Sequence, residues 1–170
     1  MVPVPSTPSA PGAAAAEIDH KVEAEMTRLL YRSAGFGLFS NFVLGLVLVA
    51  GTFTAYPTAL HGPWLGALIL VSLGRLGLNL SFARANPPSE RLHVWRRLFL
   101  TGLVVAGLIW GIAGWLYFSG GDFLSRLLLM MILCGLNAGA ARSLAPVALC
   151  YRVYVLATLT PLMIRFVTLP

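Results

Sequence analysis

The chain has 170 residues, of which only 12 are basic and 6 acidic, while 58% are hydrophobic, and its mean hydropathy is +0.81. Soluble domains average about 25% charged residues, so this charge is too sparse to solvate a globular surface. The net charge of +6 does not predict nucleic-acid binding, because the basic residues stand at the ends of apolar blocks, where they are typical of topology signals.

The N-terminal region divides into two parts. Residues 1–12 contain four prolines and predict a disordered tail, since they have little to bury. Residues 13–33 are rich in helix formers, with apolar residues three and four apart, acids first and arginines last. This order complements the helix dipole and predicts an amphipathic cytoplasmic helix before the membrane. A solvated spacer remains the alternative interpretation.

Five apolar blocks then predict a transmembrane helix bundle over residues 34–170, giving an all-α fold. Each block is close to the roughly 20 residues that cross a hydrocarbon core as a helix. The expected spans are residues 35–56, 64–83, 98–118, 123–141 and 145–167.

The short connections predict the orientation. Lysine and arginine are found before the first span, between the second and third, and between the fourth and fifth, and they are missing from the other two connections. The positive-inside rule then places the N-terminus in the cytoplasm. Five crossings would leave Pro170 on the far side.

The sequence Ser-Gly-Gly-Asp at 119–122 spells the start of the GGDEF signature of cyclic-di-GMP synthases. A nucleotide site there would need Mg²⁺ ligands and a surrounding α/β domain, and the neighbouring apolar blocks supply neither. Glycine tolerates positive φ and aspartate bonds its own backbone. The sequence therefore predicts a tight turn on the non-cytoplasmic side.

Small residues recur at four-residue spacing in two spans. Gly107 and Gly111 share a face of the third span, and Gly135 and Gly139 share a face of the fourth. Such pairs let helix backbones approach closely. They predict packing within one bundle, and the alternative is a face for self-association.

Arg75 is the one basic residue deep in the second span. It precedes Arg84 by nine residues, which is roughly 13 Å at 1.5 Å per residue. A charge there costs roughly 2.5 kcal/mol or more unless it finds a partner or water. We expect Arg75 to snorkel to the cytoplasmic headgroups or to pair within the bundle, where Asn79 shares its face and Asn137 is a candidate interhelical partner.

Aromatic residues gather at the predicted outer ends of the second and third spans. Trp64, Trp115 and Tyr117 predict an interfacial belt, where amphipathic rings normally lie. Trp110 is deeper, and either packs or lines a pocket.

No catalytic arrangement is evident. His20, His61 and His93 fall in three separate connections on two sides of the membrane, which argues against one metal site. Paired carboxylates, a phosphate-binding loop and a Ser/His/Asp arrangement are also not evident. We therefore expect neither an enzyme active site nor a cofactor in these residues.

Two stretches carry a resemblance to a known family: "WRRLFLTGLVVAGLIWGIAGW" and "AGAARSLAPVALCYRVYVLATLTPLMIRF". With the preceding spans, over about residues 26–170, the chain resembles the N-terminal membrane input region of bacterial sensor histidine kinases and GGDEF-type diguanylate cyclases. The resemblance implies a bacterial inner-membrane location. Those receptors normally have further membrane helices and a cytoplasmic catalytic domain, whereas this sequence stops at "FVTLP" after a fifth span.

Two functions are therefore expected. The first is a sensory input module without catalytic residues of its own, in which a signal biases bundle packing and the shift passes to an output domain. The second is a structural or accessory subunit that packs against partner helices, lipid or pigment. Both imply the bilayer and a protein partner or self-association through the helices. A transporter is disfavoured, since intramembrane ionisable pairs are missing.

Overall fold

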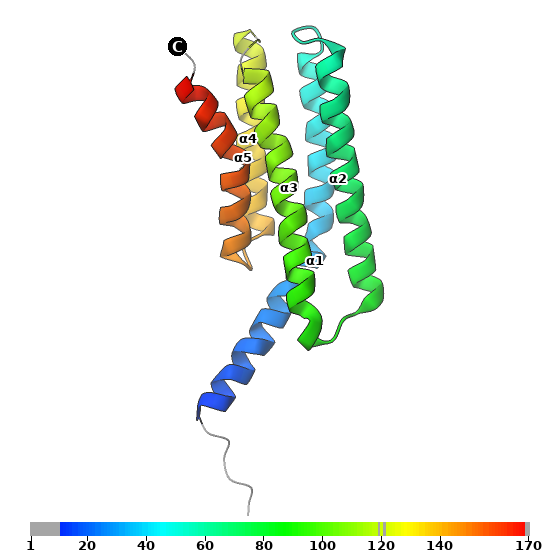
Figure 1. The fold of residues 1–170 in the computed structure, drawn as a ribbon, viewed down its shortest axis with the longest axis vertical. Coiled ribbons are helices and arrows are strands. Elements are labelled where there is room, and N and C mark those ends of the chain that lie inside the picture. Colours follow the sequence, from blue (N-terminus) through cyan, green and yellow to red (C-terminus); the bar gives the residue numbers. More distant parts are fainter. Residues whose placement is uncertain (1–10, 119, 121, 169–170) are drawn as a thin grey trace, which may run out of the picture.

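The computed structural model describes residues 11–118, 120 and 122–168, and these residues form five long α-helices and one short 3-10 turn, with no strand (Figure 1). The elements are α1 (Pro11–Thr52), α2 (Thr58–Ala85), η1 (Ser89–Arg91), α3 (Leu92–Phe118), α4 (Phe123–Ser143) and α5 (Ala148–Thr168). All five α-helices are long and apolar enough to cross a membrane. The expected all-α transmembrane bundle is confirmed.

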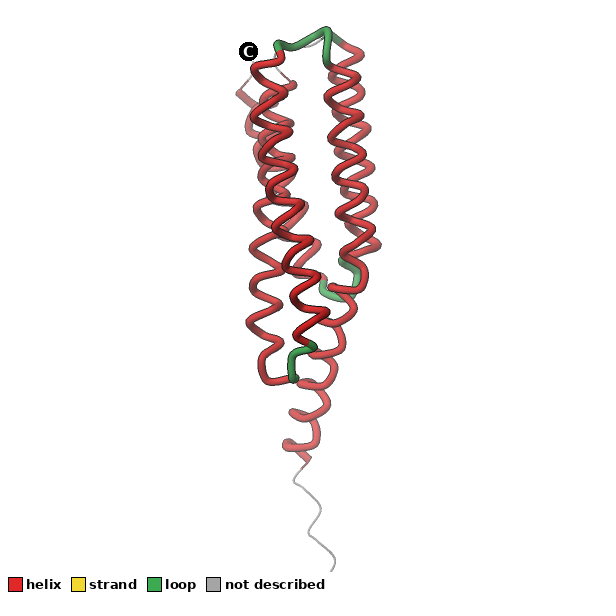
Figure 2. Tube along the Cα trace, turned by 90° about the vertical axis from the view of Figure 1, so that its right-hand side faces the viewer, coloured by secondary structure: helices red, strands yellow, loops and turns green. Residues whose placement is uncertain are grey.

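The helices run along one long axis, and their connections alternate between its two ends (Figure 2). The α1–α2 and α3–α4 connections lie at one end, together with the end of α5. The α2–α3 and α4–α5 connections lie at the other end, toward the start of α1 (Figure 1). This alternation is what five successive crossings of one bilayer require.

Helix α1 differs from the sequence-based expectation in its length. The amphipathic segment 13–33 and the first span form one continuous helix of 42 residues, which begins at Pro11. Proline is well placed at a first helical position, because its missing N–H has no intrahelical acceptor there. Leu30 and Tyr31 are buried in the bundle, so only the earlier turns extend beyond it (Figure 1). Most of the expected disordered tail, residues 1–10, lies outside the described residues.

Local sequence explains where α2 and α4 begin and end. Asn86 takes a left-handed conformation at φ 36° and donates its N–H to Phe82 O at the end of α2, and two prolines follow it. Asp122 stands before α4, and its carboxylate accepts the Ser125 N–H at 2.9 Å. The aspartate of the Gly-Gly-Asp sequence is thus a helix cap, and residues 119 and 121 of the expected turn lie outside the described residues.

Helix α3 is central and lies closest to α5. A Cβ atom on Gly107 would come within 2.9 Å of Ala157 Cβ, and one on Gly111 within 2.7 Å of Ala157 O. Pro161 has no N–H to offer that carbonyl, and the last turns of α5, red in Figure 1, lean away from α3. The two glycines therefore lie where the two helix backbones approach.

The buried side chains form two clusters along the axis. The cluster nearer the α1–α2 connection, called the outer cluster for its place in the bundle alone, contains Leu48, Tyr56, Trp64, Leu68, Ile109, Trp110, Ala113, Tyr117, Phe118, Leu129, Ile132, Leu133, Leu136 and Leu162. The inner cluster, toward the start of α1, contains Leu30, Tyr31, Ala34, Phe99, Leu103, Ala140, Leu144, Val147, Cys150 and Tyr154. Both clusters contribute residues to a cavity that lies between them.

Candidate functional site

A cavity of about 270 Å³ lies where the α1–α2 hairpin meets the other three helices. This volume falls just below the 300–1,000 Å³ that is typical of small-molecule sites. Every membrane-spanning helix contributes to its wall, with side chains that include Ser33, Phe36, Ser40, Arg75, Phe99, Leu103, Leu136, Ser143 and Tyr154. We call it the Arg75 cavity.

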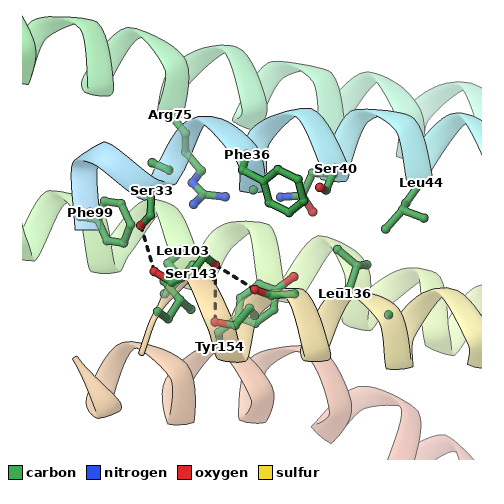
Figure 3. A pocket seen from close by; sticks show the side chains of 17 residues that line it. Ser33, Phe36, Ser40, Leu44, Arg75, Phe99, Leu103, Leu136, Ser143 and Tyr154 are labelled. Carbon is green, nitrogen blue, oxygen red and sulfur yellow. Dashed lines mark hydrogen bonds between the residues drawn. The ribbon is translucent and has the colours of Figure 1, made fainter. Parts of the chain in front are cut away.

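The guanidinium group of Arg75 enters this cavity from α2 (Figure 3). Its Cζ atom lies 6.0 Å from the centre of the Phe99 ring, at the outer limit of a cation–π contact. Gly102 leaves room for the arginine stem, because a Cβ there would lie 3.1 Å from Arg75 Cγ. Within the described residues, Arg75 forms no ion pair and no hydrogen bond.

The charged group of the cavity lies toward one of its ends. Arg75, Ser33 and Ser143 lie toward the inner end, while Leu44 and Leu136 lie toward the middle of the bundle, beside the hydroxyl of Ser40 (Figure 3). The Ser33 hydroxyl donates to Ser143 O at 2.9 Å, which joins α1 to α4 at the inner end. A molecule with one charged and one apolar end would match this gradient.

The cavity opens sideways, between α1 and α4. Phe36 on α1 is 68% exposed at its rim, and Gly135 on α4 is also exposed. Both lie well inside the segments that are apolar enough to cross a membrane. The opening therefore faces the hydrocarbon of the bilayer rather than either aqueous phase.

The two expected partners of Arg75 lie elsewhere. Asn79 does share its face of α2, but its amide donates to Tyr31 O at 3.2 Å. Asn137 makes no interhelical bond: its amide donates to Leu133 O of its own helix at 2.8 Å, and its Oδ1 finds no partner among the described residues. The pairing suggested for Asn137 is wrong, because its side chain folds back on α4.

Gly135 and Gly139 also differ from the expectation of helix packing. A Cβ atom on either would meet no atom of another described residue within 4 Å. Both line the Arg75 cavity. Their small size therefore keeps the space between α1 and α4 open, in contrast to Gly107 and Gly111, where α5 fills the equivalent space on α3.

The expected aromatic belt is wrong for two of its three members. Trp64 and Tyr117 are buried, and the Trp64 indole N–H donates to Ile109 O at 2.9 Å. Trp115 alone is exposed, at 38%, and Arg165 lies over its ring at 5.3 Å. Trp110 is fully buried and packs rather than lining the cavity, and its N–H donates to Asn41 Oδ1 at 2.8 Å.

Sequence reasoning missed several polar residues of the interior. His61 was expected in a connection, but it lies buried in the first turns of α2. Ser33, Ser40 and Asn41 on α1 were not singled out. The sequence could have identified them, because small or polar residues recur in "SAGFGLFSN" at helical spacing and so mark one face of the helix.

The described residues contain no group of three or more His, Cys, Asp or Glu side chains that could hold a metal ion. Five apolar helices around a laterally open cavity define a multi-pass α-helical membrane protein. Comparison with protein-family models, with curated proteins and with solved structures finds no match to this chain.

Proposed function

We propose that the chain is a membrane-embedded sensory input module of a bacterial signalling receptor, with no catalytic step assigned to these residues. The observation that carries the proposal is the Arg75 cavity between the α1–α2 hairpin and the other helices. A molecule that enters it contacts α1 and α4 at once. Occupation would therefore favour one packing of the two helices over another, which is what a ligand-driven switch needs.

Helix α1 provides a path for the signal out of the membrane. It lines the cavity with Ser33 and Ser40 and continues without a break back to Pro11. A tilt of α1 at the cavity would be carried along a rigid helix to its cytoplasmic end. The pattern of basic connections supports this orientation, in an inner membrane with the N-terminus in the cytoplasm.

A structural or accessory subunit is the second candidate, and the outer face of α2 favours it. Within the most apolar 18-residue stretch of α2, only 6% of the residues are buried in the bundle, compared with 44% for the corresponding stretch of α3. Gly74 and Gly77 are exposed on this face, and a Cβ on either would meet no atom within 4 Å. A partner helix could approach α2 closely there.

The intact mass of the protein, purified from its native membrane, separates the two candidates. A one-chain receptor must join this module to an output domain, so we expect a mass well above the 18.2 kDa of these residues. A mass near 18.2 kDa, with another protein co-purifying in fixed ratio, would contradict the receptor and support the subunit.

A further inference from the structure

We propose that the Arg75 cavity binds a long-chain carboxylate, with its head at Arg75 and its single acyl chain directed toward Leu44 and Leu136. This inference rests on the proposed function, because it names the ligand of the same site. It begins from the guanidinium, which lies in the membrane-spanning region and forms no ion pair within the described residues. A charge in that position is stabilised by an anion.

The acids whose side chains the structure describes are already engaged at the surface of the bundle. Glu23 lies 3.1 Å from Arg96, Glu25 lies 3.8 Å from Arg28, and Asp122 caps α4. The hydroxyls of Ser33 and Ser143 donate to backbone carbonyls. Because Arg75 forms no ion pair and no hydrogen bond within the described residues, its guanidinium has donors to offer to a ligand. Its planar fork matches a carboxylate in a bidentate pair.

The shape of the cavity favours one acyl chain. A volume of about 270 Å³ is small for a ligand site, so it holds a compact head and the first part of a chain. The remainder of the chain can leave through the lateral opening beside Phe36, which faces hydrocarbon. A diacyl phospholipid would have to bring a bulky, hydrated headgroup into the same space, at a large desolvation cost.

Access from the headgroup region is also restricted. The hydrogen bond from Ser33 to Ser143 O ties α1 to α4 at the inner end of the cavity. Entry is consequently from the side, through the bilayer interior. A fatty acid can cross the hydrocarbon as the neutral, protonated acid and give up its proton to water when it pairs with Arg75, whereas a phospholipid headgroup remains charged and at the surface.

The test measures binding of radiolabelled palmitate to the full chain, reconstituted in nanodiscs of zwitterionic phosphatidylcholine. We expect saturable binding of one palmitate per chain, with methyl palmitate at least about tenfold weaker, because the ester cannot form the charged pair. Equal affinity for the ester would overturn the proposal. So would stronger competition by phosphatidylglycerol than by palmitate, since it would assign the site to a phospholipid.

Two variants locate the site. Arg75→Gln should weaken palmitate binding at least about tenfold, and Arg84→Gln, at the exposed end of the same helix, should not. Gly139→Leu should block binding by filling the cavity, while Gly77→Leu, on the exposed face of α2, should leave it unchanged. Wild-type affinity in either cavity variant would overturn the proposal. If Arg75→Gln does not fold, Gly139→Leu and the ester comparison still decide.

The proposed ligand and the proposed function can be refuted independently of each other. Palmitate binding together with a native mass near 18.2 kDa would keep the ligand and refute the one-chain receptor. A much larger native mass without palmitate binding would keep the receptor and refute the ligand.

Discussion

The Nδ1 atom of His61 lies 2.7 Å from the phenolic oxygen of Tyr117, and the two rings stack with their centroids 5.4 Å apart. This contact joins the start of α2 to the end of α3. The Tyr56 hydroxyl adds a hydrogen bond to the backbone carbonyl of Tyr117. His61 Nε2 has no hydrogen-bond partner among the described residues. The outer end of the bundle is therefore fastened by a buried polar cluster.

Removing the Tyr117 hydroxyl should destabilise this end. Tyr117→Phe keeps the ring but leaves a second buried nitrogen of His61 without a partner. In membrane bundles such a bond contributes about 0.6 to 2 kcal/mol, so we expect a lower Tm in detergent-solubilised protein. Tyr151→Phe is the matched control, because Tyr151 is only half-buried and no hydrogen bond of its hydroxyl occurs in the described structure. Equal Tm values for both variants would contradict this prediction.

The glycines of α3 and α4 should respond in opposite ways to alanine. Gly111→Ala places a methyl group 2.7 Å from the Ala157 carbonyl oxygen, a backbone atom that cannot turn aside. We expect a loss of about 1–3 kcal/mol in the free energy of unfolding, as is usual for overpacking. Gly135→Ala meets no atom within 4 Å and should be neutral or stabilising by up to about 1 kcal/mol, since alanine favours the helix.

Chemical or thermal unfolding of the two variants, monitored by circular dichroism, measures this difference. If Gly111→Ala unfolds with the same free energy as the wild type, α3 and α5 can move apart more easily than the described contact allows.

The five spans could be predicted because each apolar block fills the width of a bilayer, whatever the neighbouring helices do. Contacts between helices could not be predicted in this way. Trp64 and Tyr117 stand at helix ends, where rings usually face the interface, and only the position of α3 beside α2 turns them inward.

Only part of the candidate site could be predicted from the sequence. The depth of Arg75 follows from its distance along the helix to Arg84, and the structure does place it within the bundle. The cavity around it depends on Gly135 and Gly139 facing α1 across an open space, which spacing alone does not distinguish from close packing. His61 was missed because the second span was expected to begin at residue 64, whereas α2 begins at Thr58. Pro63 is tolerated there, because a proline near a helix start removes few backbone bonds.

Substitution by leucine should have different effects on stability at Asn41 and at Asn137. Asn41→Leu removes the acceptor of the Trp110 indole N–H in a fully buried ring. An unsatisfied buried donor costs about 1–3 kcal/mol, so we expect a lower Tm and a shifted tryptophan emission. Asn137→Leu removes a carbonyl oxygen that has no partner among the described residues, and should be neutral or stabilising. A larger loss for Asn137→Leu would contradict this assignment.

Orientation can be tested with single cysteines. Ser89→Cys in η1 and Thr54→Cys after α1 are both exposed and lie at opposite ends of the bundle. In a Cys134→Ala, Cys150→Ala background, we expect a membrane-impermeant maleimide added to intact cells to label Thr54→Cys and not Ser89→Cys, as the basic connections predict. Lysed cells provide the control in which both react. The reverse pattern in intact cells would place the N-terminus outside.

The cap of α4 should make stability depend on pH. Hydrogen bonds from Ser125 and the charge of Arg126 hold the pKa of the Asp122 carboxyl below its ordinary value. A lowered folded-state pKa means that the charged form stabilises the fold. This contribution is complete above the unfolded value of about 3.9 and is lost as the pH falls through the lower folded value.

The Tm difference between wild type and Asp122→Ala should therefore be largest at neutral pH and should narrow as the pH falls below about 3.9. Asp122→Asn separates the charge from the cap, because its amide oxygen still accepts the Ser125 N–H but does not titrate. We expect the difference between Asp122→Asn and Asp122→Ala to be independent of pH. If the wild-type advantage also stayed constant down to the lowest pH, the carboxylate charge would not be what stabilises the start of α4.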